Sequence, residues 1–268
     1  MSSAGPQGSD GADASTPASS DSSSGTGTAR RDKPSHGGLL GLLRETVIVV
    51  GTALILSLLI KTFLVQAFYI PSESMEQTLV TGDRVLVSEL TPGPFELHRG
   101  DIVVFRDPGG WLTDVPQPQR GPVASGVVKV LTFVGILPQD AGEHLIKRVI
   151  GLPGDHVACC DAQGRVTING APLNEPYLAP GAVPSERTFD VVVPAGRVWV
   201  MGDNRQNSRD SRWHMDLPGQ GTVDEHLIVG RAFVTIWPPS RWTWLSDYKQ
   251  TFADVPAAEP AHVGAGQP

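Results

Sequence analysis

The chain has 268 residues, with 21 Lys and Arg against 28 Asp and Glu, and a formal net charge of −7. This acidic balance argues against a nucleic-acid-binding protein that relies on a basic surface. The two cysteines, Cys159 and Cys160, are too few for a multi-disulfide mini-protein or a four-cysteine zinc site, and being adjacent they lack the CxxC spacing of redox motifs.

Residues 1–44 are predicted to form a disordered segment. Residues 1–29 are rich in Ser, Gly and Ala, and such a stretch cannot bury enough apolar surface to offset its ordering entropy. Basic side chains follow at Arg30, Arg31, Lys33 and Arg44. Because positive charge favours the cytoplasmic side of a membrane, this flank predicts a cytoplasmic N-terminus.

Residues 45–68 are predicted to form a transmembrane anchor helix. Thr46–Gln66 carries a single charge, Lys61, and its 21 residues would span about 31 Å as a helix, enough to cross a bilayer core. The alternatives are a buried core helix and a cleavable secretory signal ending at Val65-Gln66-Ala67. Apolar residues on all faces oppose the first, and the long preceding segment and Lys61 oppose the second.

From Thr81 onward the pattern predicts a mostly β fold with long loops. Short β-like runs are broken by Gly and Pro, and Asn169-Gly170 is a turn signal within a hairpin. Val127–Ile136 is expected to be a strand, or a loop that contacts protein or lipid. The expected strands are 84–88, 101–105, 144–150, 166–168, 189–193, 198–201 and 232–237.

No cofactor or metal site is predicted. The seven histidines lack HxxxH and HxH spacing, and the chain has no GxGxxG, GxxxxGK or GxSxG motif.

Three segments carry candidate chemistry. Ser72 and Ser74 directly follow the apolar run. The alternative to a chemical role is that they only belong to the turn that ends the helix. Lys147 lies between Leu145 and Val149 on one face of an expected strand. Burial on that face would favour the neutral amine, which is a competent base for a serine. The alternative is an edge strand, which would leave Lys147 on the surface. Met201–Arg212 is a dense polar loop, either solvated or a network that holds other side chains.

Taken in order, these segments resemble those of bacterial type I signal peptidases, also called leader peptidases, of the actinobacterial kind. The likeness runs from about residue 45 to 237. Gln77 and Gln206 depart from the family pattern, which usually has Pro and Asp at these positions, and the spacer Trp111–Glu143 lies outside it. The similar segments are Pro71–Leu79, Gly82–Val87, Arg99–Pro108, Ile146–Asp155 and Met201–Arg212.

The resemblance implies a β-rich catalytic core preceded by one transmembrane helix. The core would comprise residues 69–155 and 197–250, with a smaller inserted β domain at 156–196 and a flexible tail at 251–268.

The resemblance also implies a membrane-bound serine endopeptidase that removes signal peptides from exported preproteins with a Ser/Lys dyad. Ser74 would be the nucleophile and Lys147 the general base. Ser72 and the Ser74 backbone N–H would hold the oxyanion, and Ser208 would orient Lys147. The supporting residues would be Asp203, Asp210, Arg212 and Arg148, and the substrate pockets would be lined by Ile70, Met75, Leu79 and Ile146.

The implied partners are preproteins and the lipid bilayer, with no nucleic acid, and the implied location is the plasma membrane, with a single span and an external catalytic domain. Two alternatives remain open: a Ser-His hydrolase that uses His144, and a non-enzymatic binding domain of the cell envelope. In an oxidising compartment Cys159 and Cys160 would be two free thiols or, as the favoured alternative, a vicinal disulfide.

Overall fold

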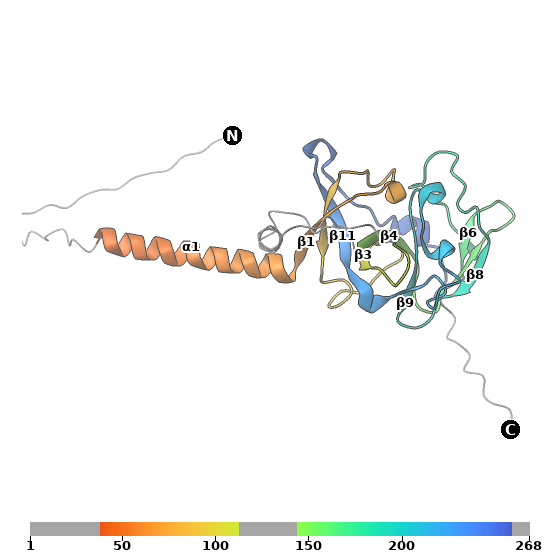
Figure 1. The fold of residues 1–268 in the computed structure, drawn as a ribbon, viewed down its shortest axis with the longest axis horizontal. Helices are drawn as coiled ribbons and strands as arrows, with labels where there is room; N and C mark the ends of the chain where they lie inside the picture. The colour runs from red at the N-terminus through yellow and green to blue at the C-terminus, as the bar shows by residue number, and fades with distance from the viewer. Residues whose placement is uncertain (1–37, 113–143, 259–268) are drawn as a thin grey trace, which may run out of the picture. The chain divides into compact units, whose positions relative to one another are not determined.

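The computed structural model describes residues 38–112 and 144–258. Within them a long helix is followed by two antiparallel sheets and several short 3-10 helices, which confirms the mostly β fold (Figure 1). Three expectations fall wholly or partly outside these residues: the disorder of residues 1–44, the strand or loop at Val127–Ile136, and the flexible tail at 251–268. The described parts of the first and third correct them, because residues 38–44 belong to a helix and Phe252 packs into a core cluster.

Helix α1 extends over Gly38–Phe63 and strand β1 over Val65–Tyr69. The predicted helix, 45–68, was therefore wrong at both ends. Its C-terminal part is a strand because the backbone of Val65–Tyr69 pairs antiparallel with β2, Arg84–Ser88, a partner that apolar content alone does not reveal. Among the described residues, no helix combines the length and apolar character needed to cross a membrane.

The larger sheet has the strand order β1-β2-β11-β3-β4-β9-β10, with β12 paired to β11. In the β3–β4 pair, Lys147 lies opposite Val103 and Arg148 opposite Ile102. Because side chains alternate between faces, the neighbouring Lys147 and Arg148 point to opposite sides of β4. The bounds of the remaining strands are β3 Ile102–Arg106, β4 His144–Gly151, β9 Arg197–Met201, β10 Val223–Asp224, β11 Ile228–Trp237 and β12 Thr243–Trp244.

Alternation along β3 and β4 divides the core of this sheet into two clusters. Ile102, Val104 and Ile146 belong to a cluster with β1 and β2 residues, whereas Val103 and Phe105 belong to a second cluster. Both faces of the central strands are therefore buried, which explains their nearly continuous apolar sequences.

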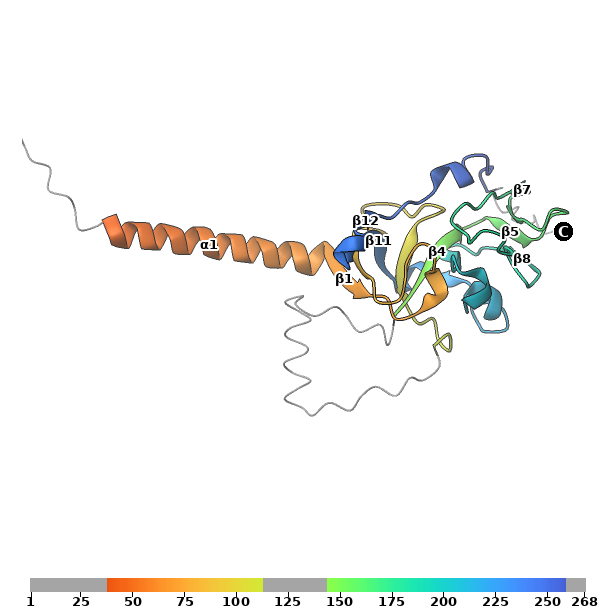
Figure 2. The same cartoon turned by 90° about the horizontal axis from the view of Figure 1, so that it is seen from above.

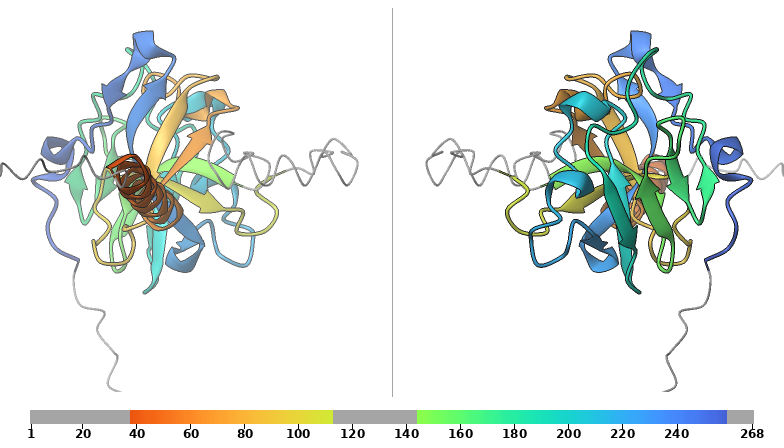
Figure 3. Two further views of the ribbon diagram at one scale, coloured as in Figure 1. Left: turned by 90° about the vertical axis from the view of Figure 1, so that its left-hand side faces the viewer. Right: turned by 90° about the vertical axis from the view of Figure 1, so that its right-hand side faces the viewer.

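The smaller sheet has the order β7-β6-β5-β8, with bounds β5 His156–Cys159, β6 Val166–Ile168, β7 Ala171–Pro172 and β8 Phe189–Val192. All four strands lie in the segment predicted as an inserted domain. Their core side chains pack with Trp199 and Met201 of β9 in one cluster. Figures 1 and 2 show this sheet at the opposite end of the β-rich part from β1 and β11, and the right-hand view of Figure 3 looks onto that end.

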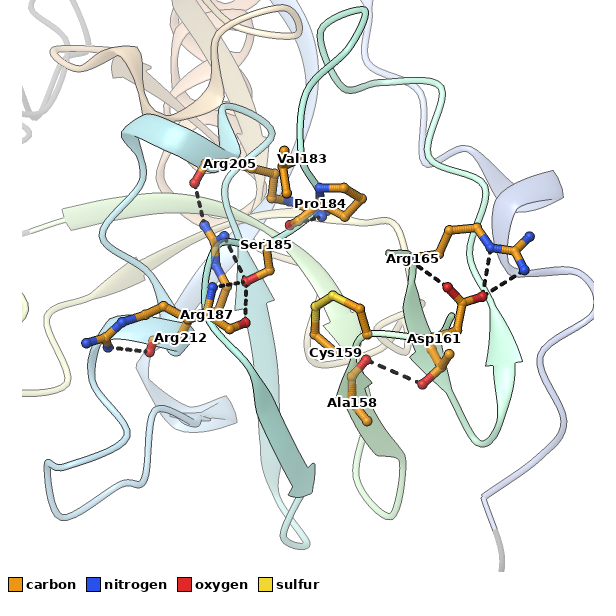
Figure 4. Close-up of a disulfide and its surroundings, with 12 residues drawn as sticks. Ala158, Cys159, Asp161, Arg165, Val183, Pro184, Ser185, Arg187, Arg205 and Arg212 are labelled. Carbon is orange, nitrogen blue, oxygen red and sulfur yellow. Dashed lines mark hydrogen bonds and ion pairs between the residues drawn. A yellow bond between two sulfur atoms is a disulfide. The ribbon is translucent and has the colours of Figure 1, made fainter. Parts of the chain in front are cut away.

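The sulfurs of Cys159 and Cys160 are joined in a disulfide at the end of β5 (Figure 4). Cys159 is buried and Cys160 is exposed. The disulfide is the favoured one of the two alternatives expected for this pair.

Short 3-10 helices fill the connections between strands. Two of them, η1 and η3, contact each other and carry residues of the candidate site. Their bounds are η1 Glu73–Met75, η3 Arg205–Asn207, η4 Ser211–Trp213, η5 Glu225–Leu227, η6 Pro239–Arg241 and η7 Lys249–Phe252.

Candidate active site

Ser74 is the central residue of η1 and is 7% exposed. The chain reaches it from β1 through Ile70, whose N–H donates to the Asp83 carbonyl and whose carbonyl accepts from the Gly82 N–H. Immediately after Ser74, Met75 enters the core with no exposed surface. The serine is thus held between a backbone-anchored segment and a buried side chain, with little freedom to move.

Lys147 lies in the middle of β4 and is 4% exposed. Its Nζ lies 2.6 Å from Ser74 Oγ and donates to the Ile146 carbonyl at 3.0 Å. Burial lowers the pKa of Lys147 to about 8, against the opposing effects of Asp210 and Asp203. An appreciable neutral fraction near neutral pH makes this amine able to accept the serine proton.

Ser72 occupies the N-cap position of η1 in an extended conformation, without a capping hydrogen bond from its side chain, and its Oγ lies 3.3 Å from Ser74 Oγ. It is exposed, unlike Ser74. This position suits a hydroxyl donor to an oxyanion formed at Ser74, as the resemblance implied.

Two buried ion pairs lie near Ser74 and Lys147: Asp203 of the loop after β9 pairs with Arg148 of β4, and Asp210 pairs with Arg212 within the loop. Arg148 Nε and Nη2 donate to the two oxygens of Asp203 at 2.8 and 2.7 Å, and Arg212 Nε and Nη2 donate to those of Asp210, both at 2.8 Å. Burial opposes ionisation of Asp210, but hydrogen bonds from Arg212 hold its pKa below the usual value. The sequence-predicted supporting residues are therefore brought together around Lys147.

Ser208 does not make the expected contact. Its Oγ donates to Asp210 Oδ2 at 2.8 Å, whereas Lys147 donates to Ser74 and Ile146. Among the described residues Ser208 makes no hydrogen bond to Lys147, and the orientation of Lys147 by Ser208 stays a prediction.

The residues predicted to line the substrate pockets belong to the core. Ile70, Met75 and Leu79 are at most 1% exposed, and Ile146 is 7% exposed. All four belong to one buried cluster, and their role in lining substrate pockets stays a prediction.

The sequence prediction missed three residues that contact the nucleophile segment or its supports. Asn204 donates through its backbone N–H to the Ser74 carbonyl at 3.2 Å and through Nδ2 to the Glu73 carbonyl at 3.1 Å. Thr78 donates to Asp203 Oδ2 at 2.5 Å. Gly202 has no room for a side chain, since a Cβ would clash with the Ser74 carbonyl and with Ser208. The dense polar composition of Met201–Arg212 was the available signal for the first and third.

His144, the alternative base, begins β4, and its ring packs edge-on against Phe68 with centroids 5.4 Å apart. The hydrogen bond to Ser74 Oγ comes from Lys147 instead. Within residues 38–112 and 144–258, no group of three or more His, Cys, Asp or Glu side chains is placed to hold a metal ion.

The family model described as "Signal peptidase, peptidase S26" matches residues 43–237. The chain is 38% identical over 242 residues to a protein of Mycobacterium tuberculosis named "Signal peptidase I", covering 83% of this chain and 81% of the relative. It is 39% identical over 196 residues to "Probable signal peptidase I-2" of Synechocystis, covering 73% and 74%. It is 32% identical over 204 residues to "Signal peptidase I" of Bacillus licheniformis, covering 73% and 89%.

Proposed function

The chain belongs to the peptidase S26 family of signal peptidases and is a serine endopeptidase, and we propose that it cleaves with Ser74 as nucleophile and Lys147 as general base. One observation carries this assignment: the buried Lys147 Nζ lies 2.6 Å from Ser74 Oγ. The geometry favours this reading over the Ser-His alternative.

The reaction begins with neutral Lys147, which accepts the Ser74 hydroxyl proton as Oγ attacks the scissile carbonyl carbon. Ser72 Oγ and the Ser74 backbone N–H donate to the oxyanion of the tetrahedral intermediate; a good donor of this kind is worth about 3–4 kcal/mol. Protonated Lys147 then gives its proton to the departing amine, leaving an acyl-enzyme on Ser74. Water, deprotonated by Lys147, attacks this ester and restores the free serine.

The two ion pairs keep this base usable. Asp203 and Asp210 both favour protonated Lys147, whereas Arg212 disfavours it. Because Arg148 and Arg212 each neutralise one carboxylate, the loop orients the site without holding the proton on Lys147.

The substrates are exported preproteins that bear signal peptides. The closed apolar packing of Met75, Leu79 and Ile146 beside Ser74 supports a preference for small residues at the first and third positions before the cut. A large side chain there would need these core residues to move.

We infer a membrane location with a cytoplasmic N-terminus and an external catalytic domain. The apolar run Thr46–Gln66 and the basic residues before it support this. In the described part of α1, apolar side chains such as Val47 and Leu54 are 64% and 65% exposed. Such exposed apolar side chains are more favourable in contact with lipid than with water. Protease added outside intact spheroplasts should digest the large domain, whereas digestion of only the first 40 or so residues would reverse the orientation.

Cleavage of a synthetic preprotein, followed by mass spectrometry of the products, tests the function. Wild-type protein should release a peptide at one site, and Ser74→Ala should release none. His144→Ala should stay active while Lys147→Ala should be inactive; the opposite result would support the Ser-His alternative. Activity that survives in Ser74→Ala would remove the proposed nucleophile and favour a non-enzymatic binding role.

A further inference from the structure

A buried carboxylate from the inserted segment contacts the catalytic loop. Glu175, in the connection between β7 and β8, accepts from Arg205 Nη2 at 2.5 Å and from Arg205 Nη1 at 2.8 Å. The side chains are 3% and 1% exposed. A bidentate pair so far from water is costly to form and costly to break, because either partner alone would be a buried unpaired charge.

Tyr177 extends this contact towards the site. Its O–H donates to Glu175 Oε1 at 2.6 Å, and its ring lies 4.3 Å from the guanidinium carbon of Arg148. Burial, and then the charge of Glu175, raise the pKa of Tyr177 well above its ordinary value, so the phenol remains a donor. Arg148 is the residue that neutralises Asp203 beside Lys147.

Arg205 in turn fixes the backbone of the loop that follows β9. Its Nε donates to the Gly202 carbonyl at 3.1 Å and its Nη1 to the Pro184 carbonyl at 3.0 Å. Its own carbonyl accepts from Arg212 Nη2 at 2.9 Å (Figure 4). Through these bonds Arg205 links loop positions 202 and 212, and the loop between them carries charged residues that act on the Lys147 amine, namely Asp203, Asp210 and Arg212.

We propose that Glu175 and Tyr177 are positioning residues for the peptidase reaction: through Arg205 and Arg148, they hold the catalytic loop against Ser74 and Lys147. This inference rests on the proposed dyad. It gives the inserted segment a role in catalysis, since its carboxylate sets the place of the loop whose Asn204 N–H binds the Ser74 carbonyl.

Glu175→Gln keeps the shape of the side chain but leaves the Arg205 cation buried without its counter-ion. The loop should then loosen and admit water to Lys147, whose pKa is lowered chiefly by burial. We expect kcat to fall about tenfold or more, since a displacement of about 1 Å can cost about a hundredfold, while KM stays within about threefold of wild type. The acid limb of kcat/KM should move to higher pH by about half a unit or more.

The experiment measures kcat, KM and the pH profile on a synthetic preprotein with the full-length chain in detergent. Asp161→Asn is the matched control, because it removes a carboxylate of the same segment that pairs with the partly exposed Arg165; it should keep wild-type values. Glu175→Asp retains the charge and should recover part of the lost kcat. Near-ultraviolet circular dichroism establishes that each variant is folded.

A folded Glu175→Gln variant with wild-type kcat and an unmoved acid limb overturns the inference. If this variant does not fold, Tyr177→Phe tests the inference instead. This variant keeps the ring over Arg148 but loses the hydrogen bond to Glu175. It should lower kcat by about threefold and move the acid limb of kcat/KM to higher pH. Unchanged kinetics in Tyr177→Phe would then overturn it. A failure of the proposed dyad can be told apart from a failure of this inference, because Ser74→Ala would remain active only if the dyad is wrong.

Discussion

Replacing Lys147 with Met should make the protein more stable at neutral pH while abolishing its activity. Met is unbranched and apolar and fills irregular core space well. The wild-type fold buries an amine whose pKa is about 8, against an ordinary value of 10.5. At about 1.36 kcal/mol per unit of pKa, this gap means that the folded state loses about 3 kcal/mol by holding the protonated amine.

The pH dependence of this gain has a defined sign. Between pH 8 and 10.5 the unfolded chain binds more protons than the folded one, so the stability of the wild type rises with pH across this window. The Met variant lacks this group. Its advantage should therefore be fully present below pH 8 and lost as the pH rises to about 10.5.

Two hydrogen bonds oppose the gain. The Met variant leaves the Ser74 Oγ and the Ile146 carbonyl without the donor they have in the wild type, at a cost of about 1 kcal/mol each. This cost does not depend on pH. The net stabilisation at pH 7 is then about 1 kcal/mol, while the difference between the two proteins should change by about 3 kcal/mol from pH 7 to pH 10.5.

Urea unfolding of both full-length proteins at several pH values provides the measurement. Each free energy of unfolding is compared at matched pH, so that titrations common to both proteins cancel. A difference between wild type and variant that stays constant within about 1 kcal/mol from pH 7 to 10.5 would refute the reasoning, because Lys147 would then titrate equally in the folded and unfolded states.

The remaining predictions concern activity. Wild-type kcat/KM should rise about tenfold per pH unit below pH 8 and level off above it. Lys147→Arg should be folded but inactive at every pH, because guanidinium does not release its proton. Cleavage by the Arg variant would show that Lys147 acts as a fixed positive charge. Gly202→Ala should lower kcat by about a hundredfold, since its Cβ displaces the Ser74 carbonyl, and a wild-type rate would show that the loop yields freely. Preproteins with Phe or Lys just before the cut should be processed far more slowly than one with Ala, and equal rates by mass spectrometry would contradict the closed packing beside Ser74. A folded variant with both Cys159 and Cys160 changed to Ser should retain cleavage, and its loss would give the disulfide a part in catalysis.

The strands were predictable where apolar runs are bounded by turn residues. Arg84–Ser88 and Val166–Ile168 have the predicted bounds, and His144–Gly151 differs by one residue. Strand β1 was missed because Val65–Tyr69 continues the apolar run of α1, and only its pairing with β2 separates the two.

The candidate site was predictable in its members but less so in its contacts. The aliphatic neighbours of Lys147 indicated burial, yet the contact with Ser74 joins residues 73 positions apart, which only the family resemblance suggested. Glu175 gave no signal, because a single carboxylate beside a proline looks like a solvated loop until Arg205 is brought against it. The partner of Ser208, Asp210, lies only two residues away, but no sequence pattern shows which neighbour its hydroxyl contacts.

The alignment of β4 with β3 determines which of two neighbouring cations faces Ser74. Lys147 and Arg148 are neighbours, and the alternation of the strand separates an amine that can lose its proton from a guanidinium that cannot. A slip of one residue would exchange the two cations, turning Arg148 towards Ser74 and leaving Asp203 with a lysine. The core would change little in apolar content, but the enzyme would lose its proposed base. Mutations in Val103 or Ile102 that weaken this alignment can therefore silence the protease without touching a catalytic group.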